Sequence, residues 1–122
     1  MNKHTLVVGA SLNPARYSHL AINRLLSHDQ PVMAYGLREG EVAGVPIETD
    51  QEAFLGKEID TITLYVGSRR QEPLMDWIVQ LAPRRVIFNP GTENPIFEQK
   101  LREAGIEVVI ACTLVMLSMQ SY

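Results

Sequence analysis

Short apolar runs alternate along this chain with stretches in which apolar residues recur at helical spacing. Five runs have the length and β-branched content of buried strands, at residues 5–8, 31–35, 61–66, 85–88 and 107–110. Between and after them, apolar spacing predicts helices near 18–26, 71–82 and 95–104, and a last short helix at 113–119. This alternation predicts an α/β fold with three α/β/α layers, in which helices cover both faces of a mainly parallel sheet.

Turn and capping residues fix the limits of several of these elements. Ser18 and Asn94 are placed to cap the first and third helices, and Pro95 follows Asn94 at a first helical position. The motif Thr49-Asp50-Gln51-Glu52 matches a capping box, which predicts a short helix over residues 51–55. Residues 37–48 contain two short apolar segments around Ala43-Gly44, and they predict either a small hairpin or two bent segments at the edge of the sheet.

Composition indicates one globular domain over residues 1–122. Apolar residues make up 46% of the chain and charged residues 20%. The net charge of -3 argues against broad binding to nucleic acid or to an anionic membrane surface. The sequence shows no signal peptide or membrane span, and its one cysteine excludes an internal disulfide, so we expect a cytoplasmic protein.

The loops that follow the strands carry the candidate chemistry. In a parallel α/β sheet, ligands bind beyond the carboxyl ends of the strands, where the strand order reverses. This rule selects four loops, at residues 9–18, 36–40, 65–70 and 89–94. Each is rich in glycine, proline, hydroxyl, amide or arginine side chains.

The first of these loops predicts a phosphate site. Gly9 ends a buried strand, and a polar path through Ser11, Asn13 and Arg16 leads to the helix that Ser18 is expected to cap. The first N–H groups of a helix lack partners, and the helix dipole favours negative charge there. The simplest alternative is an ordinary turn between strand and helix.

The loop after the second strand narrows the choice of nucleotide. A dinucleotide fingerprint would read G-x-G-x-x-G, with an acidic residue at the end of the second strand. Here the first loop has Gly9 alone, and the second strand is followed by Arg38. An arginine suits a phosphate on the ribose, which points to coenzyme A, with its 3′-phosphate, or to NADP.

Four motifs together resemble those of the small stand-alone CoA-binding domains. They are Gly9 to Ser18, Tyr65-Val66, the segment Asn89 to Asn94, and Ala111-Cys112-Thr113. That family is similar to the nucleotide-binding domain of the succinyl-CoA synthetase α subunit, and the resemblance covers nearly the whole chain. It implies a Rossmann-like, doubly wound sheet of five or six strands in a single domain, with coenzyme A or an acyl-CoA across the strand carboxyl ends.

The resemblance also assigns roles to particular residues. It implies that the first loop meets the CoA phosphates, that Arg38 reaches the 3′-phosphate, and that the later loops follow the adenosine or pantetheine. The resulting candidate cofactor-binding residues are Gly9, Ala10, Ser11, Asn13, Arg16, Ser18, Arg38, Tyr65, Val66, Asn89, Pro90 and Gly91.

Three functions stay open from the sequence. The first is non-catalytic binding of coenzyme A or an acyl-CoA by a carrier, a sensor or a partner subunit, since no catalytic constellation stands out. The second is an NADP-type reductase, or a subunit of a CoA ligase or transferase. The third is a structural homodimer, in which Met116 and Met119 of the apolar tail contribute to the contact.

Other residues have plainer interpretations. Arg69 and Arg70 are expected to form a solvated patch, and Asn94 is expected to act as a helix cap. Cys112 is expected to be a buried, inert thiol, the alternative being a mixed disulfide with the thiol of CoA. The histidines are scattered without the spacing of metal ligands, so no metal site is expected.

Overall fold

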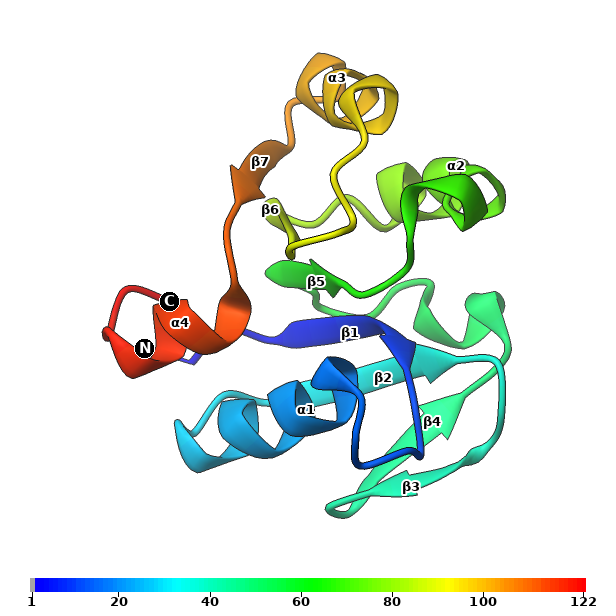
Figure 1. Ribbon diagram of the computed structural model, residues 1–122. Helices are drawn as coiled ribbons and strands as arrows, with labels where there is room; N and C mark the ends of the chain where they lie inside the picture. The colour runs from blue at the N-terminus through cyan, green and yellow to red at the C-terminus, as the bar shows by residue number, and fades with distance from the viewer. Residues whose placement is uncertain (1) are drawn as a thin grey trace.

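A seven-stranded sheet forms the centre of this computed structural model, which describes residues 2–122 (Figure 1). Its strand order is β3-β4-β2-β1-β5-β6-β7, and every neighbouring pair is parallel except the β3–β4 hairpin. The mainly parallel α/β fold is confirmed. The sheet has seven strands rather than five or six because both segments of the hairpin join its edge. The strands are β1 (Thr5–Ala10), β2 (Val32–Gly36), β3 (Gly40–Val42), β4 (Val45–Glu48), β5 (Thr61–Leu64), β6 (Arg85–Phe88) and β7 (Glu107–Ile110).

Helices cover the two faces of the sheet and give the three layers. Helices α1 (Tyr17–Ser27) and α4 (Thr113–Ser118) pack over the core that includes Val7, while α2 (Glu72–Leu81) and α3 (Pro95–Glu103) pack over the core that includes Leu6 and Val8. Because side chains alternate along a strand, β1 supplies both cores and is buried on both faces. Within residues 2–122, no helix is both long enough and apolar enough to cross a membrane.

The helix caps follow the sequence at one helix and depart from it at two. Asn94 caps α3 as expected, because its Oδ1 accepts a hydrogen bond from Phe97 N at 3.3 Å. The expected cap by Ser18 is wrong, because α1 begins one residue earlier and Arg16 is its N-cap. The box at Thr49 gives only a 3-10 turn, η1 (Gln51–Phe54), whose N-cap is Asp50. In both corrected cases the backbone turn begins at a neighbouring residue.

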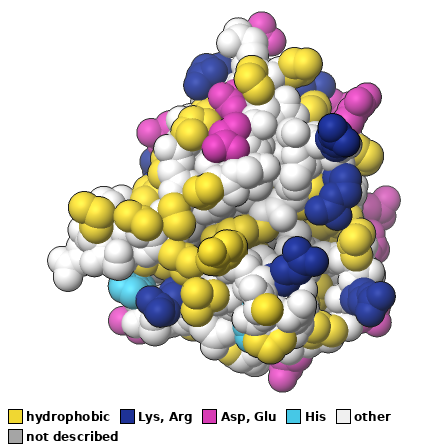
Figure 2. All heavy atoms as spheres, in the orientation of Figure 1, with side chains coloured by type: hydrophobic (Ala, Val, Ile, Leu, Met, Phe, Trp, Pro, Cys, Tyr) yellow, Lys and Arg dark blue, Asp and Glu magenta, His cyan; other side chains and the backbone are white. Residues whose placement is uncertain are grey.

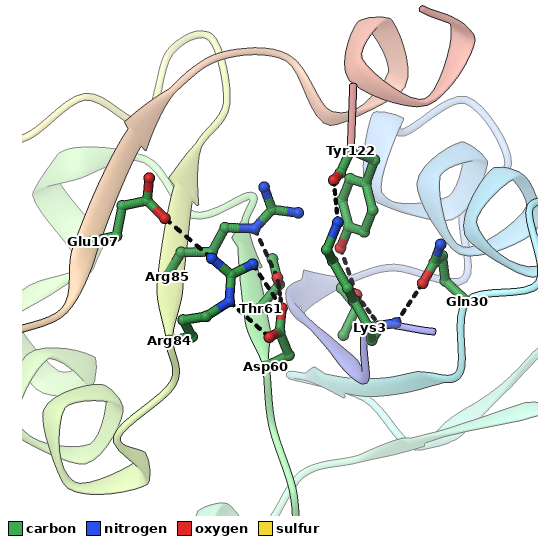
Figure 3. A network of polar contacts seen from close by, with 9 residues as sticks. Lys3, Gln30, Asp60, Thr61, Arg84, Arg85, Glu107 and Tyr122 are labelled. Carbon is green, nitrogen blue, oxygen red and sulfur yellow. Dashed lines mark hydrogen bonds and ion pairs between the residues drawn. The ribbon is translucent and has the colours of Figure 1, made fainter. Parts of the chain in front are cut away.

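A polar network at the amino edge of the sheet ties distant parts of the chain together (Figure 3). Arg84 Nε lies 2.8 Å from Asp60 Oδ1, and this hydrogen bond holds the pKa of the Asp60 carboxyl below its usual value. The Arg85 guanidinium lies over the Tyr122 ring, 4.6 Å from its centroid, and the Tyr122 hydroxyl lies 2.5 Å from Thr5 Oγ1. The C-terminal segment is therefore fixed at the edge opposite the four candidate loops.

Candidate functional site

The strand order reverses between β1 and β5, and we call the carboxyl ends of these two strands the switch point of the sheet. From β1 the chain crosses to β2 on one side, whereas β5, β6 and β7 follow on the other side. The connections leaving the neighbouring strands β1 and β5 therefore diverge, and this divergence is the position at which doubly wound sheets bind ligands. The loops at residues 9–18 and 65–70 border this position directly.

Gly9 allows the carboxyl ends of β1 and β5 to approach each other closely. Its φ is +97°, and the register between β1 and β2 shifts between Val8 and Ala10, so Gly9 forms a bulge at the end of the strand. A Cβ at this position would lie 3.0 Å from the carbonyl carbon and oxygen of Tyr65 and 3.0 Å from Val66 Cγ2. Glycine is required here by backbone conformation and by space together.

The polar side chains of the first loop organise the loop itself. Ser11 Oγ accepts a hydrogen bond from Asn13 N at 3.1 Å, and Asn13 Oδ1 accepts one from Ala15 N at 2.9 Å. These turns carry the chain to Arg16, which caps α1 without any side-chain hydrogen bond. Their role is therefore to shape the loop and to present the end of α1.

The beginning of α1 retains free hydrogen-bond donors. Within residues 2–122, the backbone N–H groups of Tyr17 and Ser18 have no acceptor, and the first turn carries no acidic residue. Free N–H groups and the positive end of the helix dipole both favour an anion at this point. Ser18 as a whole is buried, so of these two residues it is Tyr17 that is exposed at this end of α1.

Four exposed arginines lie on the candidate loops, and among the described residues none forms an ion pair. Arg16 precedes α1, Arg38 follows β2, and Arg69 and Arg70 lie in the 3-10 turn η2 (Ser68–Arg70) after β5. Several Lys and Arg side chains gather on the right of the space-filling view, the side to which β1 and β2 point in Figure 1 (Figure 2). This edge of an acidic chain is thus locally rich in unpaired positive charge.

Asn89 is a buried connector between three elements. Its Nδ2 donates to Thr63 Oγ1 at 2.8 Å and to Leu64 O at 3.0 Å, and its Oδ1 accepts from Thr113 N at 2.9 Å. The side chain therefore joins the end of β5 and the end of β6 to the start of α4. Both of its N–H donors are used, so any contact of this loop with a ligand falls to the exposed Pro90, Gly91 and Glu93.

Gln71 is a second buried connector, which the sequence did not reveal. Its Nε2 donates to Val66 O at 2.8 Å and to Thr92 O at 2.7 Å, and its Oε1 accepts from Asn94 Nδ2 at 3.0 Å. The residue is fully buried, although glutamine at a helix start ordinarily faces solvent. Nothing in the sequence pattern separates it from a surface residue.

Tyr65 directs its side chain into the core beneath α1 and α4. Burial raises the pKa of its hydroxyl to about 12, and that hydroxyl has no hydrogen-bond partner within the described residues. The nearby hydroxyls of Thr63 and Thr113 bond each other at 2.8 Å instead. The part of this segment that lies next to Gly9 at the switch point is therefore the Tyr65 backbone together with Val66.

The structure brings the predicted residues to one edge of the sheet but divides them by role. Arg16 and Arg38 are exposed and Gly9 is partly exposed, whereas Ala10, Ser18 and Asn89 are buried and Tyr65 packs into the core. A depression of about 210 Å³, lined partly by Lys3 and Tyr122, lies at the opposite edge and includes none of the predicted residues. In residues 2–122, His, Cys, Asp and Glu side chains form no cluster that fits a metal ion.

Comparison with known proteins decides the family. A family model described as "CoA binding domain" matches residues 3–118, which is nearly the whole chain. The chain belongs to the CoA-binding domain family. No curated protein matches the sequence.

Solved structures share the fold of this chain. An uncharacterized protein is 43% identical, with a TM-score of 0.95, and the match covers 100% of this chain and 99% of that one. A Thermus thermophilus protein is 23% identical, with a TM-score of 0.87 over 99% of this chain and 91% of its own. The dinucleotide-forming acetyl-coenzyme A synthetase 1 of Ca. Korarchaeum cryptofilum is 18% identical, with a TM-score of 0.71, over 89% of this chain and 25% of its own. The two more distant likenesses show the fold.

Proposed function

We propose that this chain binds coenzyme A or an acyl-CoA at the carboxyl edge of its sheet, as a non-catalytic carrier, sensor or partner subunit. The observation that carries the proposal is the switch point where Gly9 approaches Tyr65 and Val66. There, free N–H groups at the start of α1 lie in a loop that also carries Arg16. Membership of the CoA-binding domain family supports coenzyme A as the ligand. A cytoplasmic location stays a prediction.

The three phosphates of CoA fit the charges at this edge. The diphosphate suits the start of α1, because backbone N–H groups and the helix dipole act on the same anion. Arg38, which is exposed and unpaired after β2, is assigned to the 3′-phosphate. Pantetheine then follows the loops after β5 and β6, between Val66 and Gly91.

Titration calorimetry with CoA, dephospho-CoA, NADP and NAD tests this assignment. We expect CoA to bind more tightly than dephospho-CoA, which lacks the 3′-phosphate, and more tightly than either dinucleotide. Equal affinities for CoA and dephospho-CoA would remove Arg38 from the site. Preference for NADP would favour the alternative of a reductase.

Arg16→Ala and Arg24→Ala form a matched pair for the diphosphate site. Both arginines are exposed and unpaired in residues 2–122, but Arg24 lies in the last turn of the same helix. An exposed charged hydrogen bond to phosphate contributes about 1–2 kcal/mol, so Arg16→Ala should weaken CoA binding by about five- to thirtyfold. Arg24→Ala should leave the affinity unchanged. Equal effects of the two substitutions would contradict the placement of the diphosphate.

A further inference from the structure

Two of the candidate loops are joined by a single buried amide. Gln71 lies at the start of α2 and is fully buried, yet its side chain does not cap its own helix. It bonds Val66 O, in the loop after β5, and Thr92 O, in the loop after β6. No other side chain among the described residues hydrogen-bonds both of these loops.

The orientation of this amide follows from its neighbours. The oxygens of Val66 and Thr92 are backbone carbonyls, which only accept, so the Gln71 nitrogen must face them. The Gln71 oxygen then accepts from Asn94 Nδ2 at 3.0 Å, while Asn94 Oδ1 is used in capping α3. All of these donors and acceptors fit one orientation of the Gln71 amide, and its hydrogen bonds fix the distance between the two loops.

We propose that Gln71 is a positioning residue for the pantetheine part of the ligand. It touches no ligand itself, and it acts by tying the loop at Val66 to the loop at 89–94 at a fixed spacing. Loops that are already ordered spare the ligand the cost of ordering them on binding. The inference rests on the proposed binding of CoA, and it assigns to Gln71 the positioning of the two loops next to pantetheine.

The effect of Gln71 is confined to one end of the ligand. The start of α1 and Arg38 lie on the loops after β1 and β2, which the Gln71 hydrogen bonds do not reach. Adenosine 3′,5′-bisphosphate carries the nucleoside end of CoA without pantetheine. Its affinity should therefore be independent of Gln71, whereas the affinity of CoA should depend on it.

Gln71→Met provides the test, since methionine keeps the length of the side chain and removes both donors. We expect the affinity for CoA to fall by about tenfold, the equivalent of one lost hydrogen bond, and that for adenosine 3′,5′-bisphosphate to stay within about twofold. The control is Gln99→Met on the exposed face of α3, which should change neither affinity.

Asn94→Asp is a milder second variant if Gln71→Met does not fold. Aspartate keeps the oxygen that caps α3 and lacks the donor to Gln71 Oε1. We therefore expect the affinity for CoA to fall selectively again, but by a smaller factor. Equal losses for CoA and adenosine 3′,5′-bisphosphate, or unchanged CoA affinity, would overturn the positioning role. Wild-type protein that binds neither compound would instead overturn the proposed function, and this inference with it.

Discussion

Replacing Gly9 with alanine tests the close approach of the carboxyl ends of β1 and β5 at the switch point. The substitution forces a residue with a Cβ into φ = +97°, which costs about 1–2 kcal/mol. The new Cβ also lies 3.0 Å from two backbone atoms of Tyr65 and from Val66 Cγ2, and overpacking of this kind costs about 1–3 kcal/mol. The sum is about 2–5 kcal/mol of lost unfolding free energy, or about 8–20 °C in Tm for a domain of this size.

Gly91→Ala is the matched control for this prediction. Gly91 has a similar φ of +89°, but a Cβ there meets nothing within 4 Å. Gly91→Ala therefore has only the conformational cost, about 1–2 kcal/mol of unfolding free energy or about 4–8 °C in Tm. The gain from restricting the unfolded chain is common to both substitutions and cancels in the comparison.

Thermal unfolding followed by circular dichroism measures both variants against the wild type. We expect Gly9→Ala to lose clearly more stability than Gly91→Ala. Similar losses for the two variants would show that the carboxyl ends of β1 and β5 are not closely packed, and would refute the close approach of Gly9 to Tyr65 and Val66.

Two further predictions follow from shifted pKa values. The hydrogen bond from Arg84 lowers the pKa of Asp60 in the folded protein. The ionised Asp60 therefore stabilises the fold fully above the unfolded-state pKa near 4, and this stabilisation is lost as the pH falls through the lower folded-state pKa. Urea unfolding between about pH 3 and 6 should show a steeper acid loss for wild type than for Asp60→Asn, and parallel curves would contradict this. Burial raises the pKa of Tyr65 to about 12. The neutral Tyr65 hydroxyl therefore contributes fully to stability below the unfolded-state pKa near 10, and this contribution is lost as the pH rises toward the folded-state pKa. The difference in tyrosinate absorbance between wild type and Tyr65→Phe should have its midpoint near 12, and a midpoint near 10 would refute the burial.

The fold followed from the sequence because apolar periodicity records burial directly. The run at residues 85–88 became β6, which is buried throughout, and the helical spacing from Leu74 to Leu81 became α2. The edge position of residues 37–48 was also predicted, because glycine and proline mark it, and of the two alternatives there the structure shows the hairpin. Local apolar periodicity was sufficient to predict an element wherever the element's own apolar residues form its buried face.

The candidate site was foreseen only as a set of loops. The strand order, which makes Gly9 face Tyr65, comes from long-range pairing that no local pattern records. Gln71 and Asn89 each bond groups far away in the sequence, so their burial and their partners were not predictable from their neighbours. The misplaced cap at Ser18 has a different cause, since the turns at Ser11 and Asn13 let the helix begin at Tyr17.

The most direct test of the central claim is a titration of isotopically labelled protein with CoA, followed by the chemical shifts of its backbone amides. We expect the largest changes in the loops at residues 9–18, 36–40, 65–70 and 89–94, with the amides of Tyr17 and Ser18 among them. The amides of Lys3 and Tyr122, at the opposite edge, should not move. Changes confined to that opposite edge, or no changes at saturating CoA, would contradict the account.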